Sequence, residues 1–500
     1  MRLSALLEGL AVGGRTEAEA EVAGLAYDSR RVVPGDLFVT WAGERHDGAA
    51  FAAEAVARGA VAVIAPSPRP EGAPEATAAL PWLVADAPRA LLGPLAARLL
   101  GDPGRHLTLV GITGTNGKST IAALVTAMLE AAGRPCGLLG TLGHRFRGED
   151  LTGGGRTTPE GSDLVAAFAA LATRGGVAAA MEVSSHALAQ GRVEGTTFDV
   201  AAFVNLTRDH LDFHGSMEAY YGAKRRLFDQ LRPGGRAVVN RGDSWGARLA
   251  GELVAPLTCG ERGDVAALGA DFELTGTTVR LRTPRGPMDL RVPLVGRYHV
   301  ENVVLAVAIA EALELPHEAV IAGAAALRPP AGRMEAVAAG QPFPVFIDYA
   351  HTPAALEAAL RALRDVGGRR VAVVFGCGGD RDPGKREEMG EIAGRLADLP
   401  IVTSDNPRGE DPLAIIAMVE AGLRRSGNRE YRVVPDRREA IRKALAVAGP
   451  SRYAVLVAGK GHEREQIVGA ERRPFSDREE IERALAELAG QPAAAPGGER

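Results

Sequence analysis

The stretch GITGTNGKST, residues 111–120, has the composition of a phosphate-binding loop. Glycines let backbone N–H groups converge on phosphate oxygens, a lysine neutralises phosphate charge, and a serine hydroxyl can reach magnesium. A glycine-rich turn with an exposed lysine is the alternative, but here an apolar stretch precedes the loop and a helical pattern follows it. The sequence therefore predicts a nucleotide site at Gly114, Thr115, Asn116, Gly117, Lys118, Ser119 and Thr120.

Acidic residues and histidines follow two other apolar stretches. Glu182 ends GVAAAMEV, and the stretch FDVAAFVNL is followed by Asp209, His210, Asp212 and His214. Ligands bind at the carboxyl ends of strands in open α/β sheets, and a carboxylate there can hold magnesium. The serines after Glu182 could also cap a helix, and the histidines could be packed or capping groups. The residues indicate a metal or phosphate site and leave those alternatives open.

The segment YYGAKRRLF carries Lys224 beside two arginines on a predicted helix. A run of basic residues on a helix usually forms a solvated face. Taken alone, these residues predict no chemistry for Lys224.

Several charged loops also follow predicted strands between residues 333 and 463. They are AGRMEAV, FIDYAHTPAAL, FGCGGDRDPGK, TSDNPRGEDP and VAGKGHEREQ. Loops that meet at one sheet edge can form a substrate site. TSDNPRGEDP could be an ordinary turn, since Asp, Asn and Pro favour turns. It could also hold a ligand that carries both a carboxylate and an amine.

The elements that position these loops follow an α/β pattern. Strand and helix patterns alternate after residue 105 and restart after residue 332, which predicts parallel sheets covered by helices. We expect a small N-terminal α/β domain (1–104), a central domain with a phosphate-loop sheet (105–332), a doubly wound, Rossmann-like C-terminal domain (333–490) and a disordered tail (491–500). Residues 272–294 predict an antiparallel hairpin that turns at TPRGP, and the N-terminus predicts an amphipathic first helix.

Composition narrows the class of protein. The chain has 500 residues, 46% hydrophobic, and a formal net charge of −4, which disfavours a general nucleic-acid binder. Its three cysteines, Cys136, Cys259 and Cys377, are too widely spaced for a disulfide framework or a metal-ligand motif and fit a reducing cytosol. We expect no signal peptide and no membrane insertion.

Ten motifs, in this order along nearly the whole chain, resemble the ATP-dependent Mur ligases of peptidoglycan synthesis. They are GTNGKST, RTTP, MEVSSHAL, DHLDFHG, YYGAKRRLF, GRME, DYAHTP, FGCGGDRD, DNPR and GKGHE. The resemblance implies addition of meso-diaminopimelate to the D-glutamate of UDP-N-acetylmuramoyl-L-alanyl-D-glutamate through an acyl phosphate. It also implies ATP as co-substrate, Mg²⁺ as cofactor, and a cytoplasmic monomer that acts on small molecules in cell-wall synthesis, cell shape and cell division.

The resemblance also implies roles for individual residues. Lys118, Glu182, His210 and Lys224 match catalytic positions; Lys224 matches a lysine that forms a carbamate with carbon dioxide, and Ser119, Glu182, His210 and Lys224 would hold the metal. Asn302, Arg333 and Asp348 match nucleotide-binding positions. The muramoyl substrate would contact Ser29, Thr157, Thr158, Ser184, Gln190 and Arg192. Diaminopimelate would contact Arg381, Asp405, Asn406, Pro407, Arg408, Gly459 and Glu463.

One position departs from the family pattern: His299 stands where Asn-x-x-Asn usually begins, which puts its nucleotide contact in doubt, while Asn302 remains. The nearest alternative function is a lysine-adding Mur ligase. An unpaired arginine in DNPR disfavours it, because a ligand ending in an ammonium group could not pair with that cation. A folylpolyglutamate synthetase is disfavoured by the first domain with AYDSR and by DNPR in the third domain. A non-catalytic nucleotide-binding regulator is disfavoured because it would not need DHLDFHG together with Lys224.

Overall fold

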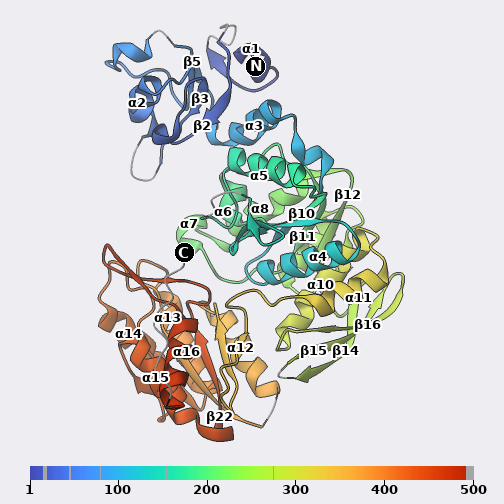
Figure 1. Ribbon diagram of the computed structural model, residues 1–500, viewed down its shortest axis with the longest axis vertical. Helices are drawn as coiled ribbons and strands as arrows, with labels where there is room; N and C mark the ends of the chain where they lie inside the picture. The colour runs from blue at the N-terminus through green and yellow to red at the C-terminus, as the bar shows by residue number, and fades with distance from the viewer. Residues whose placement is uncertain are drawn as a thin grey trace.

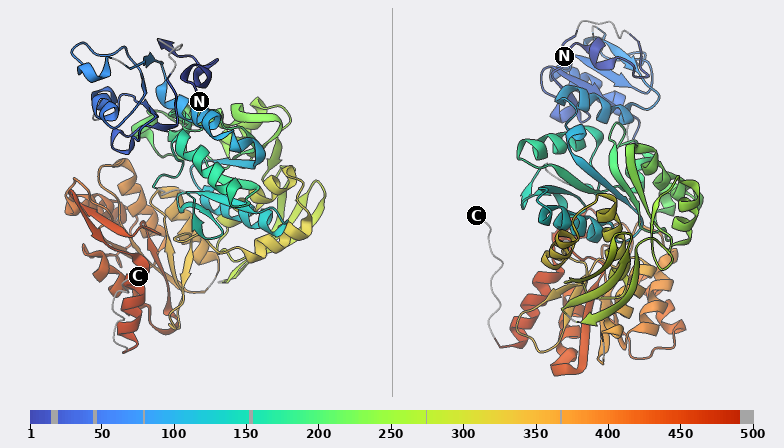
Figure 2. Two further views of the ribbon diagram at one scale, coloured as in Figure 1. Left: turned by 45° about the horizontal axis from the view of Figure 1, so that its top comes forward. Right: turned by 90° about the vertical axis from the view of Figure 1, so that its right-hand side faces the viewer.

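The computed structural model describes residues 1–14, 20–43, 47–78, 80–151, 155–273, 275–366 and 368–490, with the side chains of 76 and 450–452 excepted. The chain forms three α/β parts, each built around its own main sheet, which we call the N-terminal, central and C-terminal layers. They follow one another in chain order in all views (Figure 1, Figure 2). The α/β class that the sequence predicts is confirmed. The predicted disordered tail lies outside the described residues. No helix among the described residues is long and apolar enough to cross a bilayer.

The N-terminal sheet has the order β1-β5-β4-β3-β2, and β2 to β5 run parallel. Its strands are β1 (Gly13–Gly14), β2 (Gly24–Ala26), β3 (Asp36–Val39), β4 (Ala62–Ala65) and β5 (Trp82–Val84). Its helices are α1 (Leu3–Leu7), α2 (Ala52–Ala57) and α3 (Leu92–Leu100). The predicted first helix therefore exists, but it has five residues.

The central sheet has the order β13-β12-β11-β6-β10-β7-β8-β9. Its strands are β6 (Thr108–Thr113), β7 (Cys136–Gly140), β8 (Gly143–Phe146), β9 (Glu149–Asp150), β10 (Ala178–Glu182), β11 (Phe198–Phe203), β12 (Leu231–Asn240) and β13 (Leu257–Cys259). The strands from β13 to β7 in this order are parallel, with β6 between β10 and β11. This order brings the phosphate loop after β6 between the loops that follow β10 and β11.

Helices cover both faces of the central sheet (Figure 1). One face packs on α4 (Lys118–Ala131), α10 (Tyr298–Ala312) and α11 (His317–Ala326). The other face packs on α5 (Gly161–Thr173) and α8 (Met217–Arg225), with α6 (Ser185–Ala189), α7 (Leu211–His214) and α9 (Ser244–Glu252) nearby. Beside this sheet, β14 (Ala266–Glu273), β15 (Gly276–Thr283) and β16 (Gly286–Val292) form an antiparallel sheet. The turn predicted at TPRGP is confirmed, and β14 extends the expected hairpin to three strands.

The C-terminal sheet has the order β17-β18-β22-β19-β20-β21 and is parallel except for β17. Its strands are β17 (Glu335–Val337), β18 (Val345–Asp348), β19 (Arg370–Phe375), β20 (Leu399–Val402), β21 (Arg432–Val433) and β22 (Tyr453–Ala458). Helices α12 (Pro353–Asp365), α13 (Gly384–Leu396) and α14 (Pro412–Arg425) cover one face, and α15 (Arg437–Arg452) and α16 (Asp477–Leu488) cover the other. The doubly wound pattern is confirmed. A small hairpin of β23 (Glu465–Val468) and β24 (Glu471–Pro474) follows β22.

A buried ion pair ties α15 to α16 behind the C-terminal sheet. Arg437 donates to both carboxylate oxygens of Asp477 at 2.8 and 2.7 Å, and also to the carbonyl of Ala458 at 3.0 Å. Both side chains are fully buried. The bidentate geometry offsets the desolvation of both charges, so loss of one partner would leave the other charge unpaired in the core.

We therefore expect Asp477→Ala to lower the free energy of unfolding by about 3–5 kcal/mol, the usual cost of breaking a buried pair. Glu471→Ala is the matched control, because Glu471 pairs with Arg473 at 2.7 Å with both side chains more than half exposed. Urea titration followed by circular dichroism measures both variants. Equal midpoints for the two variants would contradict a stabilising role for the buried pair.

Candidate active site

The phosphate loop joins β6 to α4 and lies against the loop that follows β11. Asn205 accepts hydrogen bonds from the backbone N–H groups of Thr115 and Asn116 at 3.1 and 2.9 Å, which fixes the loop's path. Gly117 has φ +89° and is the N-cap residue directly before α4. A Cβ there would lie 2.4 Å from the side-chain oxygen of Asn302, so this position requires glycine.

One cavity of about 200 Å³ is lined by the predicted nucleotide-binding residues other than Gly114, Thr115 and Lys118. Its lining includes Asn116, Gly117, Ser119, Thr120, Asn302, Arg333 and Asp348, together with Tyr298 and His299. The phosphate loop follows β6 of the central sheet, and Asn302 lies on α10, which packs on that sheet. Asp348 ends β18 of the C-terminal sheet, and Arg333 lies just before β17. The cavity thus lies between the two sheets, at the carboxyl edge of β6.

The acidic wall of this cavity is strongly desolvated. Burial raises the pKa of Asp348 to about 6, although the positive charge of Arg333 acts in the opposite direction. The Asp348 carboxylate accepts a hydrogen bond from the Met334 N–H at 2.7 Å. Arg333 lies over the ring of Tyr349, 5.0 Å from its centroid. The cavity lining therefore carries two carboxylates, Asp348 and Glu301, together with the guanidinium of Arg333.

Two lysines converge on the same backbone oxygen of the phosphate loop. Lys118 Nζ donates to the carbonyls of Gly114 and Thr115, both at 2.9 Å, and Lys224 Nζ donates to Gly114 at 2.7 Å. Lys224 lies on α8 and is 1% exposed. Burial, and then the charge of Lys118, lowers the pKa of Lys224 well below its usual value. The solvated basic face that the sequence alone indicates is therefore wrong for Lys224: the side chain points inward.

Glu182 ends β10 close to these lysines. Its two carboxylate oxygens accept hydrogen bonds from the backbone N–H of Thr141 at 2.9 Å and from the Thr141 hydroxyl at 3.2 Å. Glu182 is 3% exposed, and its charge acts on Lys118 by raising the lysine's pKa against burial. Each carboxylate oxygen keeps a second lone pair for a ligand.

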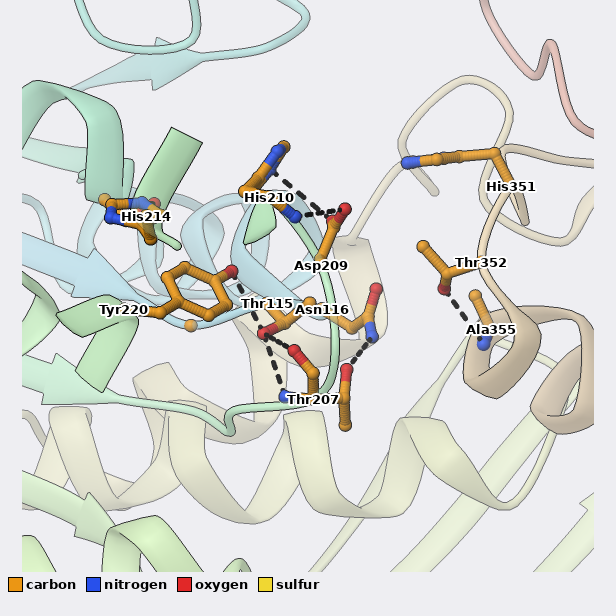
Figure 3. Close-up of polar contacts among 12 residues, drawn as sticks. Thr115, Asn116, Thr207, Asp209, His210, His214, Tyr220, His351, Thr352 and Ala355 are labelled. Atoms are coloured by element: carbon orange, nitrogen blue, oxygen red, sulfur yellow. Dashed lines mark hydrogen bonds and ion pairs between the residues drawn. The ribbon is translucent and has the colours of Figure 1, made fainter. Parts of the chain in front are cut away.

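The loop after β11 carries a cluster of rings, shown in Figure 3. His210 adopts a left-handed conformation with φ +53°, and its backbone N–H donates to Asp209 at 2.9 Å. Burial lowers the pKa of His210 to about 4, against the attraction of Asp209, so the imidazole is neutral at neutral pH. His214 contacts the Ser185 hydroxyl at 2.9 Å and stacks on Tyr220.

His351 lies opposite Asp209 on the loop between β18 and α12 (Figure 3). Its ring nitrogen Nδ1 lies 2.8 Å from the Tyr349 carbonyl, and Lys385 donates to the His351 carbonyl at 2.9 Å. Burial raises the pKa of Asp209, but His210 and His351 in their protonated forms, together with Lys385, act more strongly and lower it. Arg208 and Asp382 form a further ion pair at 3.3 Å between the central and C-terminal layers.

Four of the residues predicted to bind the muramoyl substrate form one network. The Thr158 hydroxyl donates to the Glu182 carbonyl at 2.9 Å, and the Ser184 N–H donates to Thr158 at 3.0 Å. Arg192 donates to the Thr158 carbonyl at 3.1 Å and to Gln190 at 2.5 Å. Ser184 also caps α6, so the capping role and a position at the site occur together.

The other two predicted muramoyl-binding residues lie apart from this network. The Thr157 hydroxyl lies 3.0 Å from that of Thr141, beside Glu182. Ser29 belongs to the N-terminal layer, where its hydroxyl donates to Glu54 at 2.7 Å. A hydrogen bond from Tyr27 to Asp163 connects that layer to α5.

The predicted diaminopimelate-binding residues meet at the edge of the C-terminal sheet. Asn406 donates to Glu463 at 2.8 Å, and Arg408 donates to the Gly379 carbonyl at 2.8 Å. A Cβ at Gly459 would lie 2.5 Å from an oxygen of Asp405. The remaining two residues are Pro407, buried in the same loop, and Arg381, exposed, donating to the Asp380 carbonyl at 2.9 Å.

The DNPR segment is held in an unusual conformation. Arg408 has φ +51°, its N–H donates to the Ile467 carbonyl at 3.0 Å, and its own carbonyl accepts from the Gly469 N–H at 2.7 Å. Asp405 is buried, and this raises its pKa, with Arg437 and Lys460 acting in the opposite direction. The segment is therefore more than an ordinary surface turn, because the hairpin of β23 and β24 clamps its backbone.

Some residues of the site are absent from the sequence-based expectation. Asn205 braces the phosphate loop, and Tyr298 lines the nucleotide cavity. Asn205 follows β11 directly, so the rule that ligands gather at strand ends could have found it. Tyr298 begins α10 in the mixed stretch GRYHVEN and carries no such signal.

Comparisons with known proteins give the family. The Mur ligase middle domain matches residues 112–310, the Mur ligase glutamate ligase domain matches residues 332–461, and the Mur ligase family catalytic domain matches residues 21–99. The chain belongs to the Mur ligase family. The predicted enzyme class, an ATP-dependent ligase that forms amide bonds, is confirmed.

Full-length relatives share one printed name, UDP-N-acetylmuramoyl-L-alanyl-D-glutamate–2,6-diaminopimelate ligase. The protein of Geobacter metallireducens is 43% identical over 94% of this chain and 95% of its own length. That of Streptomyces coelicolor is 44% identical over 95% of this chain and 94% of its own length.

Solved structures agree with this family. A structure of a ligase with the same name has a TM-score of 0.67 and 31% identity, and the match covers 98% of this chain and 99% of that one. The MurF ligase from Thermotoga maritima in complex with ADP has a TM-score of 0.63 at 18% identity over 94% and 97% of the two chains, which supports the fold alone.

Proposed function

We propose that this chain adds meso-diaminopimelate to the D-glutamate of UDP-N-acetylmuramoyl-L-alanyl-D-glutamate, with ATP as co-substrate. The observation that carries the proposal is a chain of contacts that links the nucleotide cavity to the predicted amino-acid site. Arg333, which lines the cavity, lies over the ring of Tyr349, and the Tyr349 hydroxyl lies 3.4 Å from Glu463, which accepts from Asn406. The network around Thr158 reaches the carbonyl of Glu182 at the end of β10. The names of the full-length relatives favour diaminopimelate over lysine as the added amino acid.

The proposed division of labour follows three ranges. Residues 1–104 hold the UDP part of the substrate, 105–332 hold ATP, and 333–490 hold the amino acid. Each sheet falls within one of these ranges, and so do the family matches, except that the match to the glutamate ligase domain begins at residue 332, one residue before the third range. We further propose a cytoplasmic monomer whose partners are its small-molecule substrates and that takes part in cell-wall synthesis, cell shape and cell division.

The chemistry begins with the substrate carboxylate, which must first be activated, because amide formation in water is uphill. Attack of the carboxylate on the γ-phosphorus of ATP forms an acyl phosphate and releases ADP. The neutral amine of diaminopimelate then attacks the acyl carbon, phosphate leaves with the bonding electrons, and the nitrogen releases one proton to solvent as the amide forms. Lys118 offsets the repulsion between carboxylate and phosphate, and donors of the site stabilise the developing oxyanion.

Mg²⁺ is the proposed cofactor, held by Ser119, Glu182, His210 and a carbamate on Lys224. Ser119 and Glu182 offer the oxygen donors that a hard cation prefers, and the Glu182 carboxylate keeps free lone pairs. His210, neutral at neutral pH, would add a nitrogen donor. No group of three or more His, Cys, Asp or Glu side chains is arranged for a metal among the described residues, so phosphate and carbamate oxygens would complete the set. When bound, the ion supplies charge neutralisation at the phosphates.

A carbamate on Lys224 has a physical basis in this site. Carbon dioxide reacts with a neutral amine, and burial beside Lys118 favours the neutral form of Lys224. In the reaction a bond forms between Nζ and the carbon of carbon dioxide, and one proton leaves. The product is an anion, so the carbamate would place a negative charge beside Lys118, where an ammonium on Lys224 would be repelled.

The most direct test of the function is phosphate release from ATP with the UDP-muramoyl dipeptide and different amino acids. Meso-diaminopimelate should support turnover far better than lysine or ornithine. Product mass should rise by one diaminopimelate residue. Turnover with lysine alone would overturn the proposed substrate, while absence of any amino-acid-dependent turnover would overturn the ligase reaction in this chain.

Lys224→Ala should lose about 100-fold or more in kcat, the usual effect of removing one electrostatic catalytic group. Melting temperature should stay close to wild type, because the variant removes a desolvated amine. Added acetate should restore part of the activity by supplying an anion in place of the carbamate. Lys443→Ala, on the exposed face of α15, is the control. Full activity of Lys224→Ala would exclude a catalytic role.

Arg408→Ala should weaken transition-state binding by about 2–5 kcal/mol, the cost of removing one partner of a desolvated charge pair. Among the described residues its guanidinium donates to Gly379 through Nη1, and the other nitrogens can reach a ligand carboxylate. The loss should appear in the KM for diaminopimelate, with ATP and muramoyl substrate nearly unchanged. Selectivity over lysine should fall as well.

The control for this variant is Arg424→Ala, which removes an exposed arginine from α14. Should all three KM values rise together in Arg408→Ala, the arginine braces the loop instead. Should selectivity for diaminopimelate persist, Arg381 and Glu463 become the next candidates for its recognition.

A further inference from the structure

Lys460 is a fully buried lysine in the loop between β22 and β23, and the reaction above assigns it no role. Its ammonium donates to three oxygens: the Asn406 side chain at 3.0 Å, Glu463 Oε2 at 2.9 Å and the Glu465 carbonyl at 2.6 Å. An ammonium has three N–H donors, so its capacity is filled. Two of its three partners are side chains that the proposed function places against diaminopimelate.

The first consequence concerns the orientation of the Asn406 amide. Its oxygen accepts from Lys460 and from the Ile467 N–H at 3.0 Å, so both lone pairs are occupied. The amide nitrogen must then face the other way, where it donates to Glu463 Oε2 at 2.8 Å. One N–H of that nitrogen remains for a ligand. A flipped amide would set its NH₂ against the Lys460 ammonium, which has no acceptor.

The second consequence concerns Glu463. Its Oε2 is taken by Lys460 and Asn406, while Oε1 lies 3.4 Å from the Tyr349 hydroxyl. Burial acts to raise the pKa of Glu463, but the charge and hydrogen bond of Lys460, with that of Asn406, bring it below the usual value. Lys460 therefore keeps Glu463 ionised and leaves Oε1 as its freer oxygen.

We infer that Lys460 is a positioning residue for the amino-acid substrate: it orients the Asn406 amide and one Glu463 oxygen toward the distal amino-acid head. That head carries a carboxylate and an ammonium, which match an N–H donor and a carboxylate oxygen. The inference rests on the proposed function for the identity of the substrate. Lys460 itself touches no substrate in this arrangement.

A purely structural role is the alternative, because Lys460 also joins the loop after β20 to the start of β23. If that were its only role, substitution of Lys460 would lower the stability of the protein and reduce the fraction of folded, active enzyme. It would leave the KM of each substrate and the pH profile of the folded fraction unchanged. The experiment must therefore separate binding of one substrate from loss of folded protein.

The test compares Lys460→Met, which keeps a similar shape without donors, with Lys460→Arg, which keeps the charge but changes the donor geometry. Lys443→Met is the control, on the exposed side of α15 with an ion pair to Glu439 at 2.8 Å. Steady-state kinetics are measured for diaminopimelate, ATP and muramoyl substrate on folded protein, together with the pH profile of kcat/KM for diaminopimelate.

In Lys460→Met we expect the KM for diaminopimelate to rise about ten- to a hundred-fold, as for loss of a charge-assisted hydrogen bond, with the other two within about two-fold. The acidic limb of the profile should move to higher pH, because Glu463 loses the cation that lowers its pKa. The other titratable and charged groups that act on or near Glu463 remain: Tyr349, Asp405, Arg437 and His462.

Lys460→Arg should also raise the KM for diaminopimelate, but leave the acidic limb in place, since the cation remains. If Lys460→Met does not fold, Lys460→Arg decides, and a diaminopimelate KM within two-fold of wild type overturns the inference. Equal changes in all three KM values overturn it too. A wild-type enzyme that prefers another amino acid refutes the proposed substrate, and the KM of that amino acid then tests Lys460.

Discussion

The site is organised around the carbonyl oxygen of Gly114, to which two buried lysines donate. Lys118 lies at the start of α4, directly after the phosphate loop, and Lys224 lies on α8. Their hydrogen bonds to Gly114 therefore connect both helices to the loop. Two ammonium groups so close together in a buried place repel each other, and burial penalises both. The arrangement is stable only if one amine gives up its proton or an anion joins them. ATP phosphates and a carbamate are both anions that meet this need.

The sheet order supplies the rest of the geometry. Because β6 lies between β10 and β11, the phosphate loop, Glu182 and the His210 loop reach the same edge. The C-terminal sheet presents Asp348 and the loops after β19, β20 and β22 along its own carboxyl edge. The cavity between them contains Arg333 and Asp348, and Arg208 pairs with Asp382 beside it. Apolar contacts join the two parts as well, because Val295 and Tyr298 pack in one cluster with residues of α12.

Much of this could be predicted from sequence, and the exceptions have physical reasons. The phosphate loop, the strand-end acids and the doubly wound block follow from local patterns, because period and glycine spacing are local properties. The inward direction of Lys224 could not be read from YYGAKRRLF, since burial depends on how α8 packs against β6. Strands β8 and β9 and the extra strand β14 were missed because short antiparallel segments depend on their partners. The hydrogen bonds of Ser29 to Glu54 and of Lys460 to Asn406 could not be predicted either, because each joins residues that are far apart in the sequence.

His299 illustrates how one substitution can keep part of a family pattern. Its Nδ1 lies 3.3 Å from the Asn302 amide nitrogen, so the ring accepts where a side-chain oxygen would otherwise accept. Burial, and then Arg333, lowers the pKa of His299 to about 3, which makes the ring neutral. With Nδ1 as acceptor, the proton resides on Nε2, a buried atom without a hydrogen-bond partner in the described part of the chain. Asn302 in turn directs its oxygen toward Gly117, where no side chain could fit. The histidine therefore preserves the orientation of Asn302 at the phosphate loop, and the departure from Asn-x-x-Asn leaves that contact intact.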